Sequence, residues 1–453
     1  MSCALRHRLD SLTIFCSISL AFSSLFCAPR QLLTVPLAQG QIKKAYDLYI
    51  ASNGELYLLF AREAKKPFAG ASYLWKIVLA KWDKNGRELW EKPLADCYGM
   101  DNRFSLFSGD SKEEIFIRGV IENRFILWKF GAQGEELWKI ESQATFSLPE
   151  RIAIGDGAGG AYVVVPTPLL LSLDKKSLSP LDIIHYAANG KVIDSFPLTF
   201  GKSPENSWLP SGPETLDTLE GICTASPQEL LLYGYSAGFG PYAGNVGHTM
   251  DYGWLSAPLI VTHVHIFLRK CDTRGRTLWN VLIPGNWNNL VVSAFAGKKG
   301  ELTVCGVTSS FSCPEEKGRS LGDLYSLQTF VFRYSSRGEQ LWCKQFGSGV
   351  SLSPVAVESD SQGNCYVLGE IKEVYPLQAS SRQKPKRVFL ASLNARGDFL
   401  WIKTFGTAVS TPFSCLRVED GSGAVAFGLK TTRFDNSQSP QEEVWVLRFM
   451  PGS

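Results

Sequence analysis

The densest group of chemically versatile side chains in this 453-residue sequence lies between residues 235 and 254. The segment combines many glycines with seven polar or aromatic candidates: Tyr235, Phe239, Tyr242, His248, Asp251, Tyr252 and Trp254. Glycines beside exposed aromatic side chains are typical of a loop that folds over a ligand or a partner chain. A loop that only caps the middle of the fold with its own aromatic side chains would have the same composition, so both interpretations stay open.

Two other patterns suggest sites but lack what such sites need. His263 and His265 are two residues apart in a strand-like run, so both side chains are expected on one face. Two ligands do not make a metal site, and no carboxylate or cysteine at a convincing spacing completes it. The segment Gly155-Asp-Gly-Ala-Gly-Gly160 resembles a phosphate-binding loop, but it is expected in a hairpin turn and not between a strand and a helix.

Motifs for catalysis are also missing from the sequence. After residue 28 the chain has four histidines, His185, His248, His263 and His265, and it contains no nucleophile elbow, zinc-protease helix or calcium loop. We therefore predict no catalytic residue, no metal and no cofactor. A site assembled from distant parts of the chain would leave no local motif, so catalysis is not excluded.

A repeated phrase predicts the elements that would position any site. A turn ending in glycine is followed, after two residues, by Leu-Trp, and this phrase recurs at Trp90, Trp138, Trp279, Trp342 and Trp401. The third unit has Asp194 where tryptophan is expected. Self-similarity at a long period is the signature of a repeat architecture.

The turn glycines count the repeats: Gly86, Gly134, Gly190, Gly275, Gly338, Gly397 and Gly452. Each unit reads as two consecutive hairpins, so four strands per unit are expected. The sequence thus predicts an all-β fold, a seven-bladed β-propeller of four-stranded antiparallel blades. The approximate blades are residues 41–97, 98–146, 147–201, 212–285, 286–348, 349–407 and 408–453.

The last blade is expected to lack its outermost strand, because the chain has only Ser453 after its seventh turn glycine. Within residues 31–38, the sequence Leu32–Leu37 matches the outer-strand sequence Leu89–Leu94 in apolar spacing and in a proline. We therefore predict that this N-terminal strand completes the last blade and closes the ring, within one domain that spans residues 29–453.

The five repeat tryptophans are predicted to be structural. Each would lie on an outer strand and face the next sheet, where a ring that buries about 150–250 Å² fills the widening gap between blades. Both tight turns of a blade should lie on one face of the disc, which we call the turn face. Most variation in length falls on the opposite loop face, which is where binding is expected.

The units resemble the repeat of exported bacterial propellers often called SBBP or β-propeller repeat proteins. The sixth unit resembles it best, with Asp360-Ser-Gln-Gly-Asn-Cys-Tyr-Val-Leu-Gly369 followed by Leu400-Trp and Thr404-Phe-Gly406. The repeat is also similar to that of quinoprotein-like propellers, including an outer-membrane assembly lipoprotein, although the Thr-Gly turn of that repeat is absent. The resemblance implies a surface or periplasmic protein that scaffolds or binds.

The N-terminus reads as an export signal over residues 1–28. Arg6 and Arg8 precede an apolar run from Leu12 to Phe26, which is too short to favour a membrane span. Cleavage after Ser23, cleavage after Ala28 and lipidation at Cys27 remain open. The expected location is the periplasm, the outer membrane surface or the outside of the cell, and no later segment is apolar enough to cross a bilayer.

Composition narrows the class of partner. The formal net charge is +3, which gives no electrostatic case for nucleic acid. Eight cysteines follow the signal singly, without a C-x-x-C pair, so a zinc or redox motif is not predicted. We expect a non-enzymatic scaffold that binds an envelope or extracellular protein through its loop face. A glycan-active hydrolase or lyase with a funnel site, and a quinoprotein-like oxidoreductase, are the alternatives.

Overall fold

The computed structural model describes most of the chain after the N-terminal segment. The described residues are 30–37, 42–63, 74–98, 103–108, 114–121, 124–143, 153–166, 181–198, 215–226, 228–239, 248–250, 259–283, 290–297, 299–308, 328–347, 351–372, 387–405, 410–419, 423–433 and 441–450. The predicted signal over residues 1–28 and most of the predicted loop-face segments lie outside them. Within these ranges no helix is long and apolar enough to cross a membrane.

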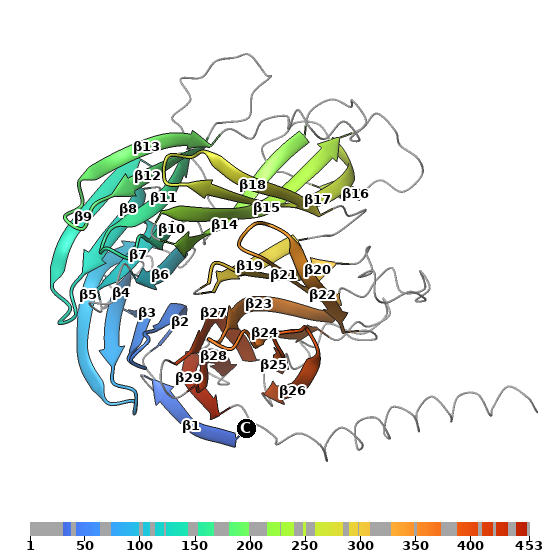
Figure 1. The fold of residues 1–453 in the computed structure, drawn as a ribbon. Coiled ribbons are helices and arrows are strands. Elements are labelled where there is room, and N and C mark those ends of the chain that lie inside the picture. The colour runs from blue at the N-terminus through green and yellow to red at the C-terminus, as the bar shows by residue number, and fades with distance from the viewer. Residues whose placement is uncertain are drawn as a thin grey trace, which may run out of the picture.

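Seven antiparallel sheets are arranged as the blades of a propeller (Figure 1). Blade 1 contains β2 (Lys44–Ile50), β3 (Leu56–Glu63), β4 (Leu74–Trp82) and β5 (Glu88–Tyr98). Blade 2 contains β6 (Arg103–Ser108), β7 (Ile115–Ile121), β8 (Arg124–Phe130) and β9 (Glu136–Gln143). Blade 3 contains β10 (Ala153–Gly155), β11 (Ala161–Pro166), β12 (Leu181–Tyr186) and β13 (Val192–Leu198).

The remaining blades follow in chain order. Blade 4 contains β14 (Thr215–Ser226), β15 (Glu229–Phe239), β16 (His248–Met250), β17 (Leu259–Asp272) and β18 (Thr277–Ile283). Blade 5 contains β19 (Leu290–Ala296), β20 (Leu302–Thr308), β21 (Gln328–Tyr334) and β22 (Gln340–Phe346). Blade 6 contains β23 (Ser351–Ser359), β24 (Cys365–Lys372), β25 (Arg387–Leu393) and β26 (Phe399–Phe405). Blade 7 contains β27 (Ser410–Val418), β28 (Val425–Arg433) and β29 (Gln441–Met450).

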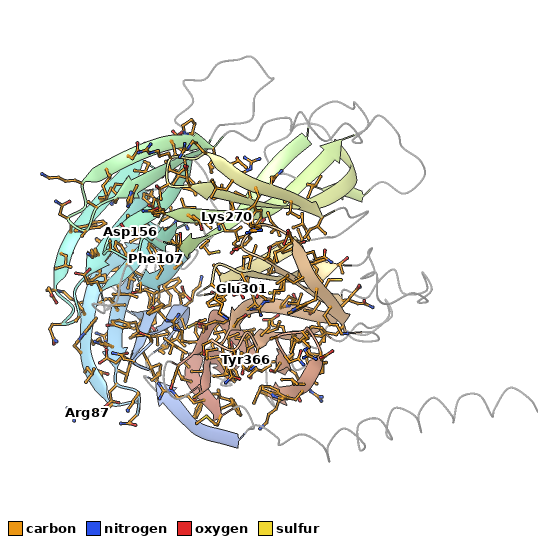
Figure 2. All side chains as sticks on the ribbon, viewed as in Figure 1. Arg87, Phe107, Asp156, Lys270, Glu301 and Tyr366 are labelled. Carbon is orange, nitrogen blue, oxygen red and sulfur yellow. The ribbon has the colours of Figure 1, made fainter. Side chains whose placement is uncertain are left out.

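The first strand of each sheet lines the centre of the ring. β2, β6, β10, β14, β19, β23 and β27 each contact the inner strand of the next blade, and β27 contacts β2, so the contacts run around the whole circle. The space between sheets is filled by apolar clusters that combine residues of neighbouring blades, as the packed side chains in Figure 2 show. The core is therefore a set of radial layers between blades, as the predicted seven-bladed fold requires.

The turn glycines adopt the backbone conformation that makes them necessary. Gly86, Gly134, Gly190, Gly275, Gly338 and Gly397 have φ between 78° and 87°, a left-handed region that side-chain-bearing residues rarely occupy. In each turn the glycine N–H donates to the carbonyl three residues earlier, as from Gly134 to Gly131 at 2.9 Å. Gly452 lies outside the described residues.

An extra residue follows each of these turns in the outer strand. Opposite Lys129 and Phe130 of β8 stand Trp138 and Glu136 of β9, so Leu137 has no partner and forms a β-bulge. The apolar bulge residues are half exposed, at 42% for Leu89 and Leu137, 59% for Ile193, 50% for Leu278 and 52% for Leu341. They lie one to a blade around the rim, and in blade 3 the neighbouring Val192 is exposed as well, at 58%.

The last blade consists of three consecutive strands, β27 to β29. Residues Arg30–Leu37 form β1, which runs antiparallel beside β29 from Arg30 opposite Met450 to Leu37 opposite Val444. Its register shifts between Gln31, opposite Phe449, and Leu33, opposite Arg448, so that one residue of β1 is left without a partner, as in the outer strand of blade 2.

The seam between blades 7 and 1 also holds bonds that do not involve β1. Lys430 Nζ donates to the carbonyl of Ala45 at 3.4 Å, and the N–H of Ala45 donates to Glu442 at 2.5 Å. The N–H of Glu442 in turn donates to the carbonyl of Ile42 at 3.1 Å. These bonds join the first and last blades directly.

Blade 4 differs from its neighbours and from the predicted loop. Strands enter both ends of the segment over residues 235–262 that is predicted as a loop: β15 reaches Phe239, β17 begins at Leu259, and β16 adds a short fifth strand to the sheet. β18 pairs with β17 only from Ile266 onward, so the paired strands extend beyond the outer strand. The pairing of β15 with β17 continues through small residues such as Ser236 and Gly238, which single-sequence patterns do not mark as strand.

Candidate functional site

A buried basic side chain recurs on the third strand of the blades. It stands opposite the repeat tryptophan of the fourth strand: Lys81 faces Trp90, Lys129 faces Trp138, Lys270 faces Trp279 and Arg333 faces Trp342. Arg448 occupies the same position in blade 7, opposite Leu33. These five residues are between 1% and 6% exposed, and we call them the clamp residues.

Each clamp residue forms an ion pair with a carboxylate of its own blade. The N···O distances are 2.7 Å for Lys81 with Glu55, 2.6 Å for Lys129 with Glu114, 2.7 Å for Lys270 with Glu229, 3.8 Å for Arg333 with Glu301 and 2.6 Å for Arg448 with Glu419. Because a buried charge is costly without a partner, each carboxylate makes the burial of its base possible.

The clamp residues also reach the next blade. Lys81 donates to the carbonyl of Ala132, Lys270 to that of Ser336 and Arg333 to that of Gly363, and each acceptor lies in a turn of the following blade. Arg448 of blade 7 donates to the carbonyls of Lys84 and Gly54 in blade 1. One charge therefore joins the two hairpins of its own blade and ties them to the neighbour.

The repeat tryptophans donate to the same turns. The indole N–H groups of Trp90, Trp138, Trp279 and Trp342 bond the carbonyls of Ala132, Ala188, Ser336 and Ala395 at 2.8–3.1 Å. Their rings lie against the next turn glycine, so that a Cβ on Gly397 would stand 2.8 Å from the ring of Trp342. No such bond is described for Trp401, and its counterpart turn around Gly452 lies outside the described residues.

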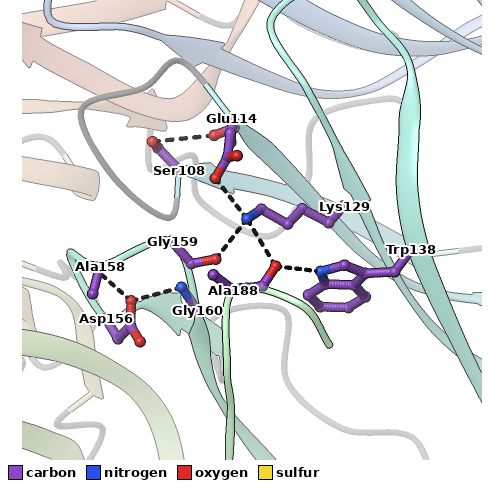
Figure 3. A network of polar contacts seen from close by, with 9 residues as sticks. All are labelled: Ser108, Glu114, Lys129, Trp138, Asp156, Ala158, Gly159, Gly160 and Ala188. Carbon is purple, nitrogen blue, oxygen red and sulfur yellow. Dashed lines mark hydrogen bonds and ion pairs between the residues drawn. The ribbon is translucent and has the colours of Figure 1, made fainter. Parts of the chain in front are cut away.

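Blades 2 and 3 show the complete network (Figure 3). Lys129 Nζ contacts Glu114 at 2.6 Å and donates to the carbonyls of Gly159 at 2.7 Å and Ala188 at 3.2 Å. Ala188 also accepts from the indole of Trp138 at 2.8 Å. A single ammonium group and a single indole thus fix both turns of blade 3.

Blade 3 itself carries different residues at the clamp positions. His185 stands opposite Asp194 where the other blades pair a base with tryptophan. His185 Nε2 contacts Asp156 Oδ2 at 2.9 Å, and the ring of Tyr162 stacks on the imidazole with centroids 4.1 Å apart. Asp194 accepts from the N–H of Ser195. The bonds described for His185 and Asp194 therefore stay within blade 3.

The environment of Asp156 favours its ionised form. Burial alone would raise the pKa of this carboxyl, but hydrogen bonds from His185 and from the N–H groups of Ala158 and Gly160 lower it below its usual range. Burial also raises the pKa of Tyr162 to about 12, and the negative charge of Asp156 adds to this effect. The Gly155–Gly160 segment is a β10–β11 hairpin turn, as its sequence context predicts, and its aspartate binds its own turn and His185.

A second polar group lies on the inner strands. Asp47 of β2 accepts from the N–H of Leu106 in β6 at 2.7 Å, and Glu358 of β23 accepts from the N–H of Val418 in β27 at 3.0 Å. Arg417 approaches Glu358 at 3.4 Å. Burial raises the pKa of nearby Tyr49, an effect that Arg417 and a hydrogen bond with Ser108 oppose. These carboxylates therefore join inner strands of adjacent blades.

Burial suppresses the ionisation of four thiols among the described residues. It raises the pKa of Cys223 and of Cys271 to about 12. Burial also raises the pKa of Cys365 and Cys415. Since the thiolate is the reactive form, these groups behave as small apolar side chains. Cys313 lies outside the described residues.

The predicted binding residues fall partly within the described chain. Tyr235 and Phe239 lie in β15 and His248 lies in β16, whereas Tyr242, Asp251, Tyr252 and Trp254 lie outside the described residues. Val261 of β17 pairs with Phe239 on one side and with His248 on the other, so the backbones of these two residues flank one strand. His263 and His265 lie in β17, as their strand-like run predicts.

The clamp residues were not singled out in the sequence, although a signal for them exists. A lysine, arginine or histidine precedes the first residue of the second turn by two positions, as in Lys81 before Asp83, Lys129 before Gly131 and Lys270 before Asp272. The position of the carboxylate partner differs from blade to blade. Glu55 lies at the end of the first turn of its blade, whereas Asp156 and Glu419 lie at the beginning of theirs. Because the position of the carboxylate varies, a single repeat pattern does not reveal which acidic residue pairs with the base.

Comparison with known proteins assigns no family to the chain. No family model and no curated protein matches the chain. Among solved structures, it is similar to a DUF4221 family member from Bacteroides vulgatus, with 12% identity, TM-score 0.35 and coverage of 94% of this chain and 97% of that one. It is also similar to the Dos1 propeller, with 9% identity, TM-score 0.42 and coverage of 94% and 96%.

A third similar structure is an apocarotenoid oxygenase variant from Synechocystis, with 10% identity, TM-score 0.43 and coverage of 94% and 96%. One of these three proteins is named as an oxygenase, and the names of the other two state no activity. At such low identity the likeness concerns the fold alone. The chain is a seven-bladed β-propeller, similar in fold to these proteins.

Proposed function

We propose that this chain is an exported, non-enzymatic propeller that binds an envelope or extracellular protein through its loop face. The observation that carries the proposal is the contrast between the two faces. On the turn face the charged side chains of the clamps are used to join blades, as Lys129 is by its bonds to Glu114, Gly159 and Ala188. On the loop face blade 4 adds paired strand length and a fifth strand beyond the repeat.

Paired backbone supports binding better than an unpaired insertion would. The backbones of residues 235–239 pair with those of residues 261–266, on either side of the sequence segment that is rich in glycine and aromatic residues. A rigid base lowers the entropy that is lost when a binding segment is ordered against a partner. The apolar run Leu12–Phe26 supports export, and the partner is then a protein of the same compartment.

The inner carboxylates favour binding over glycan hydrolysis. A glycosidase needs two carboxyl groups that face the scissile bond. Asp47 and Glu358 instead accept hydrogen bonds from main-chain N–H groups of the next blade, at 2.7 and 3.0 Å. No described residue gives specific support to the hydrolase or to a quinone-dependent oxidoreductase.

The direct test replaces residues 240–258 by a short glycine-containing turn, which leaves the β15–β17 pairing of residues 235–239 intact. The matched control shortens residues 309–327, the corresponding segment of blade 5. Tagged proteins are incubated with envelope extracts, and the bound proteins are quantified by mass spectrometry. We expect the blade 4 variant to lose specific partners and the control to keep them, with circular dichroism showing that both fold. Equal recovery by both variants would contradict the proposal.

We further propose that β1 completes the last blade and closes the ring. The register shift between Gln31 and Leu33 supports this role, because it repeats the bulge of the other outer strands. Deleting residues 30–37 should increase amide hydrogen exchange in β29, whereas removing residues 1–29 alone should not. Unchanged protection of β29 in the first variant would show that β1 is dispensable.

A further inference from the structure

The seams between blades are not equally secured. Between blades 1 and 2, 2 and 3, 4 and 5, and 5 and 6, a clamp residue and a tryptophan both bond carbonyls of the next blade. Between blades 7 and 1, Arg448 does so. The seam between blades 3 and 4 has His185 and Asp194 at these positions, and their described bonds remain in blade 3.

The chemistry of the two side chains explains why they do not reach blade 4. The histidine side chain is shorter than that of lysine or arginine. The groups that contact the imidazole of His185 also belong to blade 3. Asp156 contacts His185 at 2.9 Å from the β10–β11 turn, Tyr162 stacks on it from β11, and Asp194 stands opposite it on β13. Lys129, from β8, bonds Gly159 and Ala188 on either side of this group. Asp194 has no N–H donor that could replace an indole.

The seam between blades 6 and 7 also lacks a basic clamp residue, because Ser392 occupies the position. There the inner strands compensate: Glu358 accepts from the N–H of Val418 and approaches Arg417. The absence of the clamp is therefore offset at that seam by a buried carboxylate that spans both blades.

The contacts described between blades 3 and 4 are apolar. Tyr162, Ile183, Phe196 and Leu198 of blade 3 pack with residues of blade 4 that include Phe267 and Cys271. Phe196 lies against Gly275, where a Cβ would stand 2.5 Å from the ring, and so occupies the place that tryptophan takes elsewhere. Apolar packing is less directional than charge-assisted bonds and permits small displacements of one layer on another.

We propose that the seam between blades 3 and 4 is the hinge of the ring, at which blade 4 separates from blade 3 before any other pair of blades separates. Blade 4 also carries the extended sheet, so the hinge would let that sheet adjust its position. The proposal rests on the distribution of clamps and does not require the proposed partner.

The chain contains its own probes for this test. Cys271 lies in the apolar cluster between blades 3 and 4, whereas Cys223 packs against the cluster between blades 4 and 5. Both thiols belong to blade 4, and burial raises the pKa of both to about 12. Cys271 is 1% exposed, whereas Cys223 is partly exposed, so faster labelling of Cys271 would report opening and not static access.

The experiment treats the native protein with a small thiol-alkylating reagent and follows each cysteine by peptide mass spectrometry. Cys365, in the cluster between blades 5 and 6, reports global unfolding. We expect Cys271 to be labelled at least about tenfold faster than both Cys223 and Cys365, the factor that corresponds to one missing charge-assisted hydrogen bond. Equal rates at the three sites, or faster labelling of Cys223 than of Cys271, would overturn the proposal.

A variant tests the cause of the difference. Lys270→Met removes the clamp between blades 4 and 5, so labelling of Cys223 should rise towards the rate of Cys271 while Cys365 stays slow. If all three cysteines of the Lys270→Met variant are labelled rapidly, the variant has unfolded, and the labelling rates of the wild-type protein alone test the proposal. If it folds and the Cys223 rate is unchanged, the clamps do not control opening and the proposal fails.

Discussion

The seam between blades 2 and 3 and the seam between blades 3 and 4 solve the same packing problem with different chemistry. In the first, Lys129 and Trp138 bond carbonyls of the next blade and the ammonium is neutralised by Glu114. In the second, His185 and Asp194 bond within their own blade, and Phe196 packs on Gly275. The comparison shows that apolar layers suffice to join two blades, and that the clamps add directional bonds between turns.

The largest effect should follow removal of the clamp from the seam between blades 2 and 3. Lys129→Met leaves the partly buried carboxylate of Glu114 without its ion-pair partner and removes a donor from the carbonyls of Gly159 and Ala188, of which Ala188 keeps the indole of Trp138. We expect a loss of about 3–5 kcal/mol in the free energy of unfolding, measured by urea denaturation. The matched change His185→Gln breaks no bond between blades and should cost clearly less. A similar loss in both variants would mean that the seams are equivalent.

A pair of glycine substitutions tests whether the tryptophan contact matters beyond the turn itself. Gly157 and Gly190 both have φ of 79°, but a Cβ on Gly157 meets no atom within 4 Å, whereas one on Gly190 stands 2.9 Å from the ring of Trp138. Gly157→Ala should cost about 1–2 kcal/mol from backbone strain alone. Gly190→Ala should cost about 1–3 kcal/mol more, because the indole must shift.

Thermal and urea unfolding of the two glycine variants, measured together, gives this difference directly. Equal destabilisation would show that Trp138 yields without cost, and the indole would then be a filler and not a fixed contact between blades.

The smallest effect concerns pH and blade 3. Because the pKa of Asp156 is lowered in the folded protein, its ionised form contributes stability above its unfolded-state pKa, and that contribution is lost as pH falls through the folded-state pKa. Wild type should exceed Asp156→Asn in stability by about 1–2 kcal/mol near neutral pH. The difference should shrink as the pH falls from the unfolded-state pKa of Asp156 through its lower folded-state pKa. Urea titrations at several pH values measure it, and a difference that grows towards acid pH would contradict the assigned contacts.

The repeat pattern predicted the architecture well because it depends on local chemistry. A glycine with positive φ followed by alternating apolar residues defines each second hairpin, and six of the seven predicted turn glycines lie in the described residues with that conformation. The sheets and their antiparallel order follow from these hairpins. Where the third unit departs from the pattern at Asp194, the structure has the odd seam.

The parts that could not be predicted depend on contacts between units. The basic residue before most of the turns is visible in the sequence, but a lone lysine in a strand usually indicates solvent exposure. Its burial depends on Glu55 or Glu114 from another hairpin and on a carbonyl from another blade. The extension of blade 4 was predicted as loop because Ser236, Ala237 and Gly238 disfavour strands, yet cross-strand pairing with residues 263–265 holds them.

The extra residue in the outer strands has a consequence for the protein in a crowded solution. A blade ends in an open row of N–H and C=O groups to which a strand from another molecule can add, and this is a common route to aggregation. The bulge at Leu89, Leu137, Ile193, Leu278 and Leu341 twists that row and breaks its regular spacing close to the turn. The same irregularity that leaves an apolar side chain in water thus discourages the blades from polymerising.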